Sequence, residues 1–168
     1  RLDQIDWVFY WADAVSTLAL GPMLVHFSLN FPGIAGEQHK TGYFPVLVLY
    51  GLAGLLGTFH VVLLASDAAS AIFQERVDLF WRLQFTVLGA HVFLGVGLML
   101  SAIRRMSSVA ARRQLGWIVG GVVVGGLPSM LGYALPRSLG FNPIPIELVV
   151  VPLGLVPLAF GAAIVGYR

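Results

Sequence analysis

The segment 47–65 reads LVLYGLAGLLGTFHVVLLA, and the segment 148–167 reads LVVVPLGLVPLAFGAAIVGY. Both are apolar on every side, whereas the strands of an outer-membrane barrel alternate apolar and polar residues. A helix satisfies its own backbone hydrogen bonds, and this makes it the structure that such a stretch adopts in lipid. Each segment is also close to the roughly 20 residues needed to cross a hydrocarbon core. The two segments therefore predict membrane-spanning helices.

Three further apolar runs have a similar length. We expect five transmembrane helices, at about 7–31, 43–65, 79–103, 115–135 and 146–167. Turn or charge signals separate them, such as Pro32-Gly33 after the first run and Arg104-Arg105 after the third. The predicted fold class is all-α, a polytopic integral membrane helical bundle that forms a single transmembrane domain over residues 1–168.

The composition supports a membrane protein. Apolar residues make up 58% of the 168 residues, charged residues 11%, and the mean hydropathy is +0.85. In soluble domains, apolar residues make up about 45–50% and charged residues about 25%. Disorder is excluded, and a soluble enzyme is disfavoured because a chain of this length has too little interior for so much apolar surface. The absence of cysteine excludes disulfides and thiolate metal sites.

The distribution of arginine along the chain predicts the orientation of the helices in the membrane. Four of the ten basic residues fall between the third and fourth runs, with no acid among them: Arg104, Arg105, Arg112 and Arg113. Such a bias marks a cytoplasmic loop and gives no reason to expect nucleic acid as a partner, despite a pI near 9.3. Alternation then puts the N-terminus and the segments 66–78 and 136–145 outside, and the segment 33–42 and the C-terminus inside. We expect a bacterial inner (cytoplasmic) membrane, and a chain that is processed or part of a longer one, because it begins with Arg1.

Polar residues inside the spans are the candidate functional residues, because burying them in lipid is costly. They are Asp13, His26, Asn30, His60, Arg82, Gln84 and His91. Asp13 and Arg82 fall at similar depths near the outer surface, which predicts either an Asp13–Arg82 pair or separate solvation. Asn30 is expected to form a local hydrogen bond.

The histidines allow two interpretations. His26, His60 and His91 are either partners in interhelical hydrogen bonds or ligands of a haem or a chlorophyll-type pigment. His60 and His91 differ in depth by roughly 7 Å at 1.5 Å per residue, which is awkward for a shared haem. We expect hydrogen bonds, no cofactor and no metal. No HExxH, paired carboxylates or Ser-His-Asp arrangement predicts a catalytic site.

Glycine marks a packing surface on the fourth helix. Gly121-Val-Val-Val-Gly125 is a GxxxG motif, and Gly120 and Gly126 flank it. Small residues let helix backbones approach closely in lipid. The partner of this surface is expected within the chain, in a second copy (a homodimer), or in another membrane subunit.

Three stretches carry a resemblance to a known family. They are HFSLNFP at 26–32, RRQLGWIVGGVVVGGLPSMLGYALP at 112–136, and VPLGLVPLAFGAAIVGYR at 151–168. In this order they resemble the multi-helix membrane sensor region of bacterial histidine kinases of the competence and quorum-sensing type. The resemblance implies signal transduction in a two-component system, with the last helix leading into a cytoplasmic output domain. The chain itself has no phospho-accepting histidine motif and no ATP-binding domain, so we expect no enzymatic activity from it.

Three functions are therefore compatible with the sequence. The first is a sensor or signal-transducing membrane domain. The second is an accessory or scaffold subunit of a larger membrane complex, such as a photosynthetic light-harvesting or reaction-centre assembly or a respiratory one. The third is a small transporter or haem-bearing membrane protein, which rests on His60, His91 and Arg82.

Overall fold

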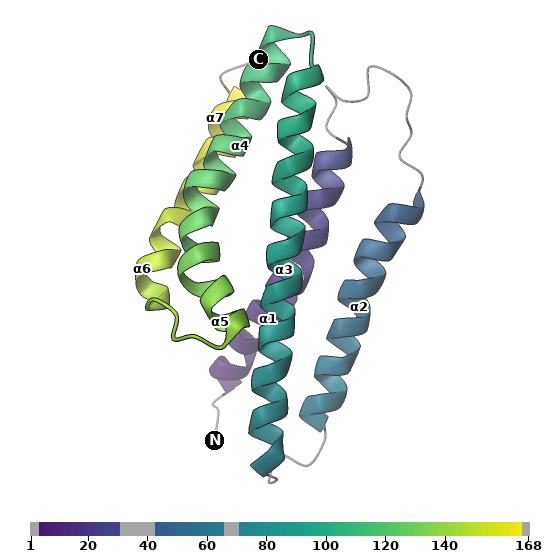
Figure 1. The fold of residues 1–168 in the computed structure, drawn as a ribbon, viewed down its shortest axis with the longest axis vertical. Helices are drawn as coiled ribbons and strands as arrows, with labels where there is room; N and C mark the ends of the chain where they lie inside the picture. Colours follow the sequence, from purple (N-terminus) through teal and green to yellow (C-terminus); the bar gives the residue numbers. More distant parts are fainter. Residues whose placement is uncertain (1–3, 31–42, 66–70, 166–168) are drawn as a thin grey trace.

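A computed structural model shows a bundle of long helices (Figure 1). The structure describes residues 4–30, 43–65 and 71–165, and these include no strand. The elements are α1 (Gln4–Asn30), α2 (Tyr43–Ala65), α3 (Ala71–Arg105), α4 (Val109–Ser129), the π-helix η1 (Met130–Ala134), α5 (Leu135–Leu139), α6 (Ile146–Val150), the 3-10 helix η2 (Val151–Gly154) and α7 (Leu155–Val165).

Five helical stretches are long and apolar enough to cross a membrane. They are Ile5–Asn30, Phe44–Ala65, Glu75–Arg105, Val109–Leu139 and Ile146–Val165. The prediction of an all-α chain with five such helices is confirmed. Phe31, the segment 33–42 and residues 166–167, which the sequence analysis also assigned, lie outside the described residues.

Two helices begin earlier than predicted. Helix α3 starts at Ala71, so residues 71–78, which were expected outside the membrane between the second and third spans, belong to the same helix as the third span. Helix α4 starts at Val109 rather than near Leu115, because the Ser108 hydroxyl accepts a hydrogen bond from the Ala111 amide and caps the helix. Only three residues separate α3 from α4, and the predicted arginine loop is mostly helical.

This short turn is held by an arginine. The Arg112 guanidinium donates a hydrogen bond of 2.5 Å to the Met106 carbonyl, just past the last turn of α3. A cation is favourable there, because the carbonyls at a helix C-terminus lack helical partners. Arg112 therefore has a structural role besides any role in topology.

The fourth span runs past its predicted end near Leu135. Pro128 lacks an N–H, and the π-helix η1 begins two residues later and continues into α5. The span ends at Gly140, whose φ of 80° suits glycine. The chain then folds back, because the Ile144 amide donates to the Gly132 carbonyl at 2.8 Å and the Ser129 hydroxyl donates to the Val149 carbonyl.

The helices form two pairs. Helix α1 packs chiefly on α3, and α4 packs chiefly on α7 and η2, while α2 lies at the side of the first pair (Figure 1). We call the end where α1 begins, near α5 and α6, the N-end. The opposite end, where α7 ends and α3 turns into α4, is the C-end. Near the C-end, a cluster that includes Met99, Leu115 and Ala163 joins the two pairs.

Two of the four predicted packing glycines lie at a close helix contact. A Cβ added to Gly121 would overlap the Cβ of Ala159 on α7, and one added to Gly125 would lie 2.7 Å from the Pro152 carbonyl oxygen in η2. Gly120 and Gly126 have no such neighbour within 4 Å. The motif thus packs α4 against the last span of the same chain, and its two outer glycines do not take part.

Adding one methyl group tests this contact. We expect Gly121→Ala to destabilise the protein by about 1–3 kcal/mol, the usual cost of overpacking, because the Ala159 Cβ cannot rotate away. The matched change Gly120→Ala should be neutral or stabilising, because alanine is the better helix former and meets open space. Thermal unfolding in detergent measures both; equal effects of the two changes would contradict the packing.

Candidate functional site

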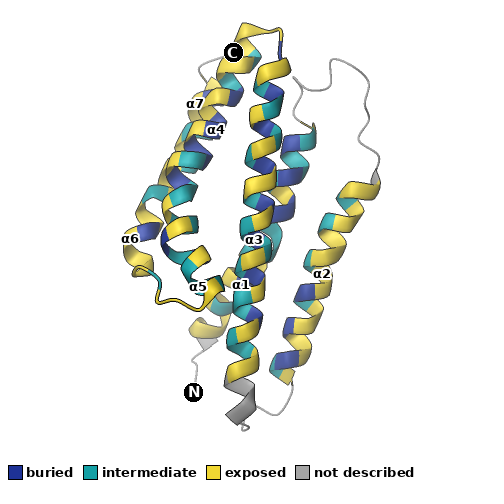
Figure 2. Cartoon of the chain, in the orientation of Figure 1, coloured by how far each residue is buried: buried dark blue, intermediate teal, exposed yellow. Residues whose placement is uncertain are grey.

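The buried polar side chains gather between α1, α2 and α3. His60, Gln84 and His91 are each at most 7% exposed, and they face α1 near Tyr10 and Thr17. We call these five residues the polar seam. Figure 2 shows that outward helix faces are mostly exposed, while buried residues line the inward ones. The seam is therefore an interior feature of the first helix pair and α2.

His60 is enclosed by aromatic rings. Its Nε2 lies 2.5 Å from the Tyr10 hydroxyl, which links α2 to α1. The rings of Trp11, Phe80 and Trp81 also surround it, and the Phe80 centroid lies 4.6 Å away. This is the interhelical hydrogen bond that the sequence predicts for a histidine in a span. It anchors α2, which otherwise makes few contacts with the bundle.

Gln84 and His91 both lie on α3. The Gln84 amide nitrogen donates to the Ala14 carbonyl on α1 at 3.2 Å. The His91 Nδ1 lies 2.7 Å from the Val87 carbonyl oxygen. A carbonyl only accepts, so Nδ1 carries the proton and, in the neutral ring, Nε2 is an acceptor. His91 thus bonds within its own helix rather than between helices.

The three candidate histidines do not converge. His26 lies 3.2 Å from the Tyr50 hydroxyl, so it links α1 to α2 away from the seam. The rings of His60 and His91 are enclosed by side chains, and neither turns a nitrogen to the bundle surface. Among the described residues, no three His, Cys, Asp or Glu side chains are grouped so that they could hold a metal ion.

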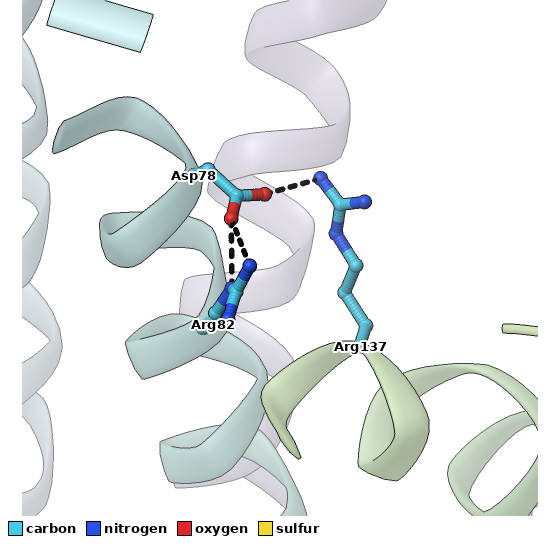
Figure 3. A network of polar contacts seen from close by, with 3 residues as sticks. All are labelled: Asp78, Arg82 and Arg137. Atoms are coloured by element: carbon cyan, nitrogen blue, oxygen red, sulfur yellow. Dashed lines mark hydrogen bonds and ion pairs between the residues drawn. The ribbon is translucent and has the colours of Figure 1, made fainter. Parts of the chain in front are cut away.

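A second polar site joins the two helix pairs at the N-end. Asp78 on α3 binds Arg82 one turn along the same helix, at 2.6 Å, and Arg137 on α5, at 2.9 Å (Figure 3). The three side chains are 34% to 41% exposed. One carboxylate therefore serves two guanidinium groups, and the cluster carries one excess positive charge.

The predicted Asp13–Arg82 pair does not form. Arg82 binds Asp78 instead, while Asp13 is exposed on α1. The physical reason is the helical extension of α3: once residues 71–78 are helical, Asp78 and Arg82 are neighbours at i,i+4. The sequence signal was present, but it was missed because Asp78 was placed in the segment 66–78, outside the third span. Asn30 does form the expected local bond, from its amide nitrogen to the His26 carbonyl at 2.9 Å.

The four arginines expected to fix the topology lie together at the C-end. Arg104 and Arg105 form the last turn of α3, and Arg112 and Arg113 lie in the first two turns of α4. None of the ion pairs found among the described residues involves them.

Comparison with protein-family models, with curated proteins and with solved structures finds no match for this chain.

A pair of double-mutant cycles tests the assignment of the ion pairs. We expect Asp78→Asn and Arg137→Gln to be non-additive, with a coupling of about 0.2–1 kcal/mol, small because the groups are partly exposed. The effects of Asp13→Asn and Arg82→Gln should add. Unfolding free energies of the single and double variants give both couplings; a coupled Asp13–Arg82 cycle would restore the pair predicted from the sequence.

Proposed function

We propose that this chain is a multi-pass domain of a bacterial inner membrane that passes a signal from the outer face to the cytoplasm. The proposal has two parts, insertion into the membrane with a defined orientation, and movement of one helix pair against the other. Each part is supported by separate observations.

Insertion is supported by the outward faces of the helices. Large apolar side chains on all five spans are exposed, for example Phe9, Phe44, Phe93, Val124 and Val151. Soluble monomers rarely carry contiguous apolar patches of such extent, and lipid is the solvent that such a surface fits.

The spacing of the arginines also fits a bilayer. Arg82 and Arg104 lie on the single helix α3, about 33 Å apart at 1.5 Å per residue. The hydrocarbon core is about 30 Å thick, so both guanidinium groups reach a headgroup region. Trp81 is adjacent to Arg82, and Trp117 lies one turn after Arg113, as expected for rings at the two interfaces. The four arginines of the C-end favour the cytoplasm, which puts the N-end outside.

Cysteine labelling tests the orientation, and the natural chain has no cysteine to interfere. We expect Ser107→Cys, in the turn between α3 and α4, to resist a membrane-impermeant thiol reagent applied to intact cells. Ser138→Cys, in α5 near the opposite end, is the matched control and should react. The reverse pattern would invert the proposed topology.

The arrangement of the two helix pairs carries the signalling proposal. Among the described residues, Asp78–Arg137 is the one ion pair that joins the pairs, and it lies at the N-end. At the C-end the pairs meet in an apolar cluster beside a three-residue turn. A change at the Asp78–Arg137 ion pair therefore alters the position of the second helix pair, which includes α7, relative to the first helix pair. Because α7 ends at the C-end, its movement is available to the cytoplasm.

Spin labels at Leu100→Cys on α3 and Val165→Cys on α7 measure this movement, because both side chains are exposed. In lipid nanodiscs, we expect Asp78→Asn to shift or broaden the distance distribution between the labels. Asp13→Asn is the matched control, since Asp13 is a carboxylate on α1 outside the ion-pair cluster. An unchanged distribution in Asp78→Asn would contradict the signalling proposal.

A groove beside α4 and α7 favours a second candidate, an accessory subunit of a larger membrane complex. The groove has a volume of about 870 Å³ and is lined by residues that include Arg113, Gly116, Trp117, Gly120, Leu158 and Ala162. Gly116 and Gly120 are four residues apart with open space above them, a spacing that accepts a partner helix. Purification in mild detergent separates the candidates, because only an accessory subunit is recovered in a complex of fixed stoichiometry.

A further inference from the structure

The polar seam contains a small cavity between α1, α2 and α3. The space open to the centre of a water molecule is about 10 Å³, near the volume that one water needs. Its polar side chains are Thr17 on α1, and Gln84 and His91 on α3. The remainder of the lining is apolar and includes Ala53 on α2.

Two hydrogen-bond acceptors of this lining are buried without a partner in the described structure. They are the Gln84 Oε1 and the His91 Nε2. Gln84 is 1% exposed and His91 is 7% exposed, so bulk solvent reaches neither. The Gln84 amide nitrogen is already committed to the Ala14 carbonyl, and the His91 Nδ1 proton to the Val87 carbonyl. Both unpartnered atoms therefore require a donor from elsewhere.

Pro22, which lies inside α1, frees a third acceptor, a backbone carbonyl. Pro22 has no N–H, so the Leu18 carbonyl one turn earlier lacks its ordinary helical partner. Leu18 and Pro22 both line the same cavity. In membrane helices, ordered water is one of the groups that satisfy a carbonyl freed in this way. The lining side chains supply one further hydrogen-bond donor for these acceptors, the hydroxyl of Thr17.

We propose that this cavity is a binding site for one water molecule, which donates its two protons to the Gln84 Oε1 and the His91 Nε2. The Thr17 hydroxyl then donates to the water oxygen. A guest of this size has two protons to give, which match the two unpartnered side-chain acceptors, and the Leu18 carbonyl is a further acceptor of the same lining. A bare cation does not, because no carboxylate lines the cavity and its charge would be buried without a counter-charge. The water would be an integral part of the contact between α1 and α3.

Solid-state NMR of the protein in lipid bilayers tests the site directly. With ¹⁵N-labelled histidine, we expect magnetisation transfer from water protons to the His91 Nε2, a signal assigned by its loss in His91→Phe. His26 lies near the C-terminal end of α1 and is partly exposed, so it is the positive control for magnetisation transfer from water. Transfer to His26 but not to His91 would show a dry cavity and overturn the proposal.

Filling the cavity provides an independent test. Ala53→Val projects methyl groups into the lining, whereas Gly54→Ala adds one where no side chain or neighbouring helix lies within 4 Å. If water is bound, Ala53→Val should reduce the His91 transfer several-fold and lower the melting temperature, while Gly54→Ala changes neither. A dry cavity would instead be stabilised by Ala53→Val, and that result overturns the proposal.

If Ala53→Val does not fold, Thr17→Val replaces it, because valine has the shape of threonine without the hydroxyl. A reduced His91 transfer in Thr17→Val supports the bound water. Transfer equal to that of the parent protein would exclude the proposed hydrogen bonding of that water.

Discussion

The close approach of α4 to the last span, at Gly121 and Gly125, is the contact on which the second half of the bundle depends. In lipid, apolar helices gain nothing from burying apolar surface against each other, so van der Waals contact has to hold them together. The two glycines allow that contact, since a Cβ on either would collide with Ala159 or with the Pro152 carbonyl. The interrupted helix α6–η2–α7 is thereby held along α4.

The first helix pair is held by different means. Helices α1, α2 and α3 share the polar seam, with hydrogen bonds from Tyr10 to His60 and from Gln84 to the Ala14 carbonyl. Polar contacts are directional, and in a bundle they fix which helices are neighbours more specifically than apolar packing does. The first helix pair carries the polar residues, and the second carries the glycine contact. The two pairs meet at the Asp78 cluster and at the apolar cluster near the C-end. This division of interactions is what makes relative movement of the two pairs physically reasonable.

Particular residues show where reasoning from the sequence succeeded and where it stopped. Run length and composition predicted the five helices, and the GxxxG motif marked the two glycines of the close contact. The local bond of Asn30 followed from the chemistry of its side chain at a helix end. The partner of Arg82 was missed, because the polarity of the segment 66–78 separated Asp78 from the third span, although Asp78 and Arg82 have the i,i+4 spacing of a helical ion pair. That Gln84 and His91 line one cavity was also missed, since this depends on how α1, α2 and α3 pack together.

The sequence by itself determined that the chain is helical and that five of its helices are apolar enough to span a membrane, because these properties depend on runs of neighbouring residues. Only the tertiary structure decided which helices are neighbours and which polar side chains share an interface. The physical reason is that most of these spans are apolar all around, so no polar stripe marks the face that turns inward. The choice among equally apolar faces is made by shape, as at Gly121 and Ala159, and by hydrogen-bond partners that lie far apart along the chain, as Tyr10 and His60 do.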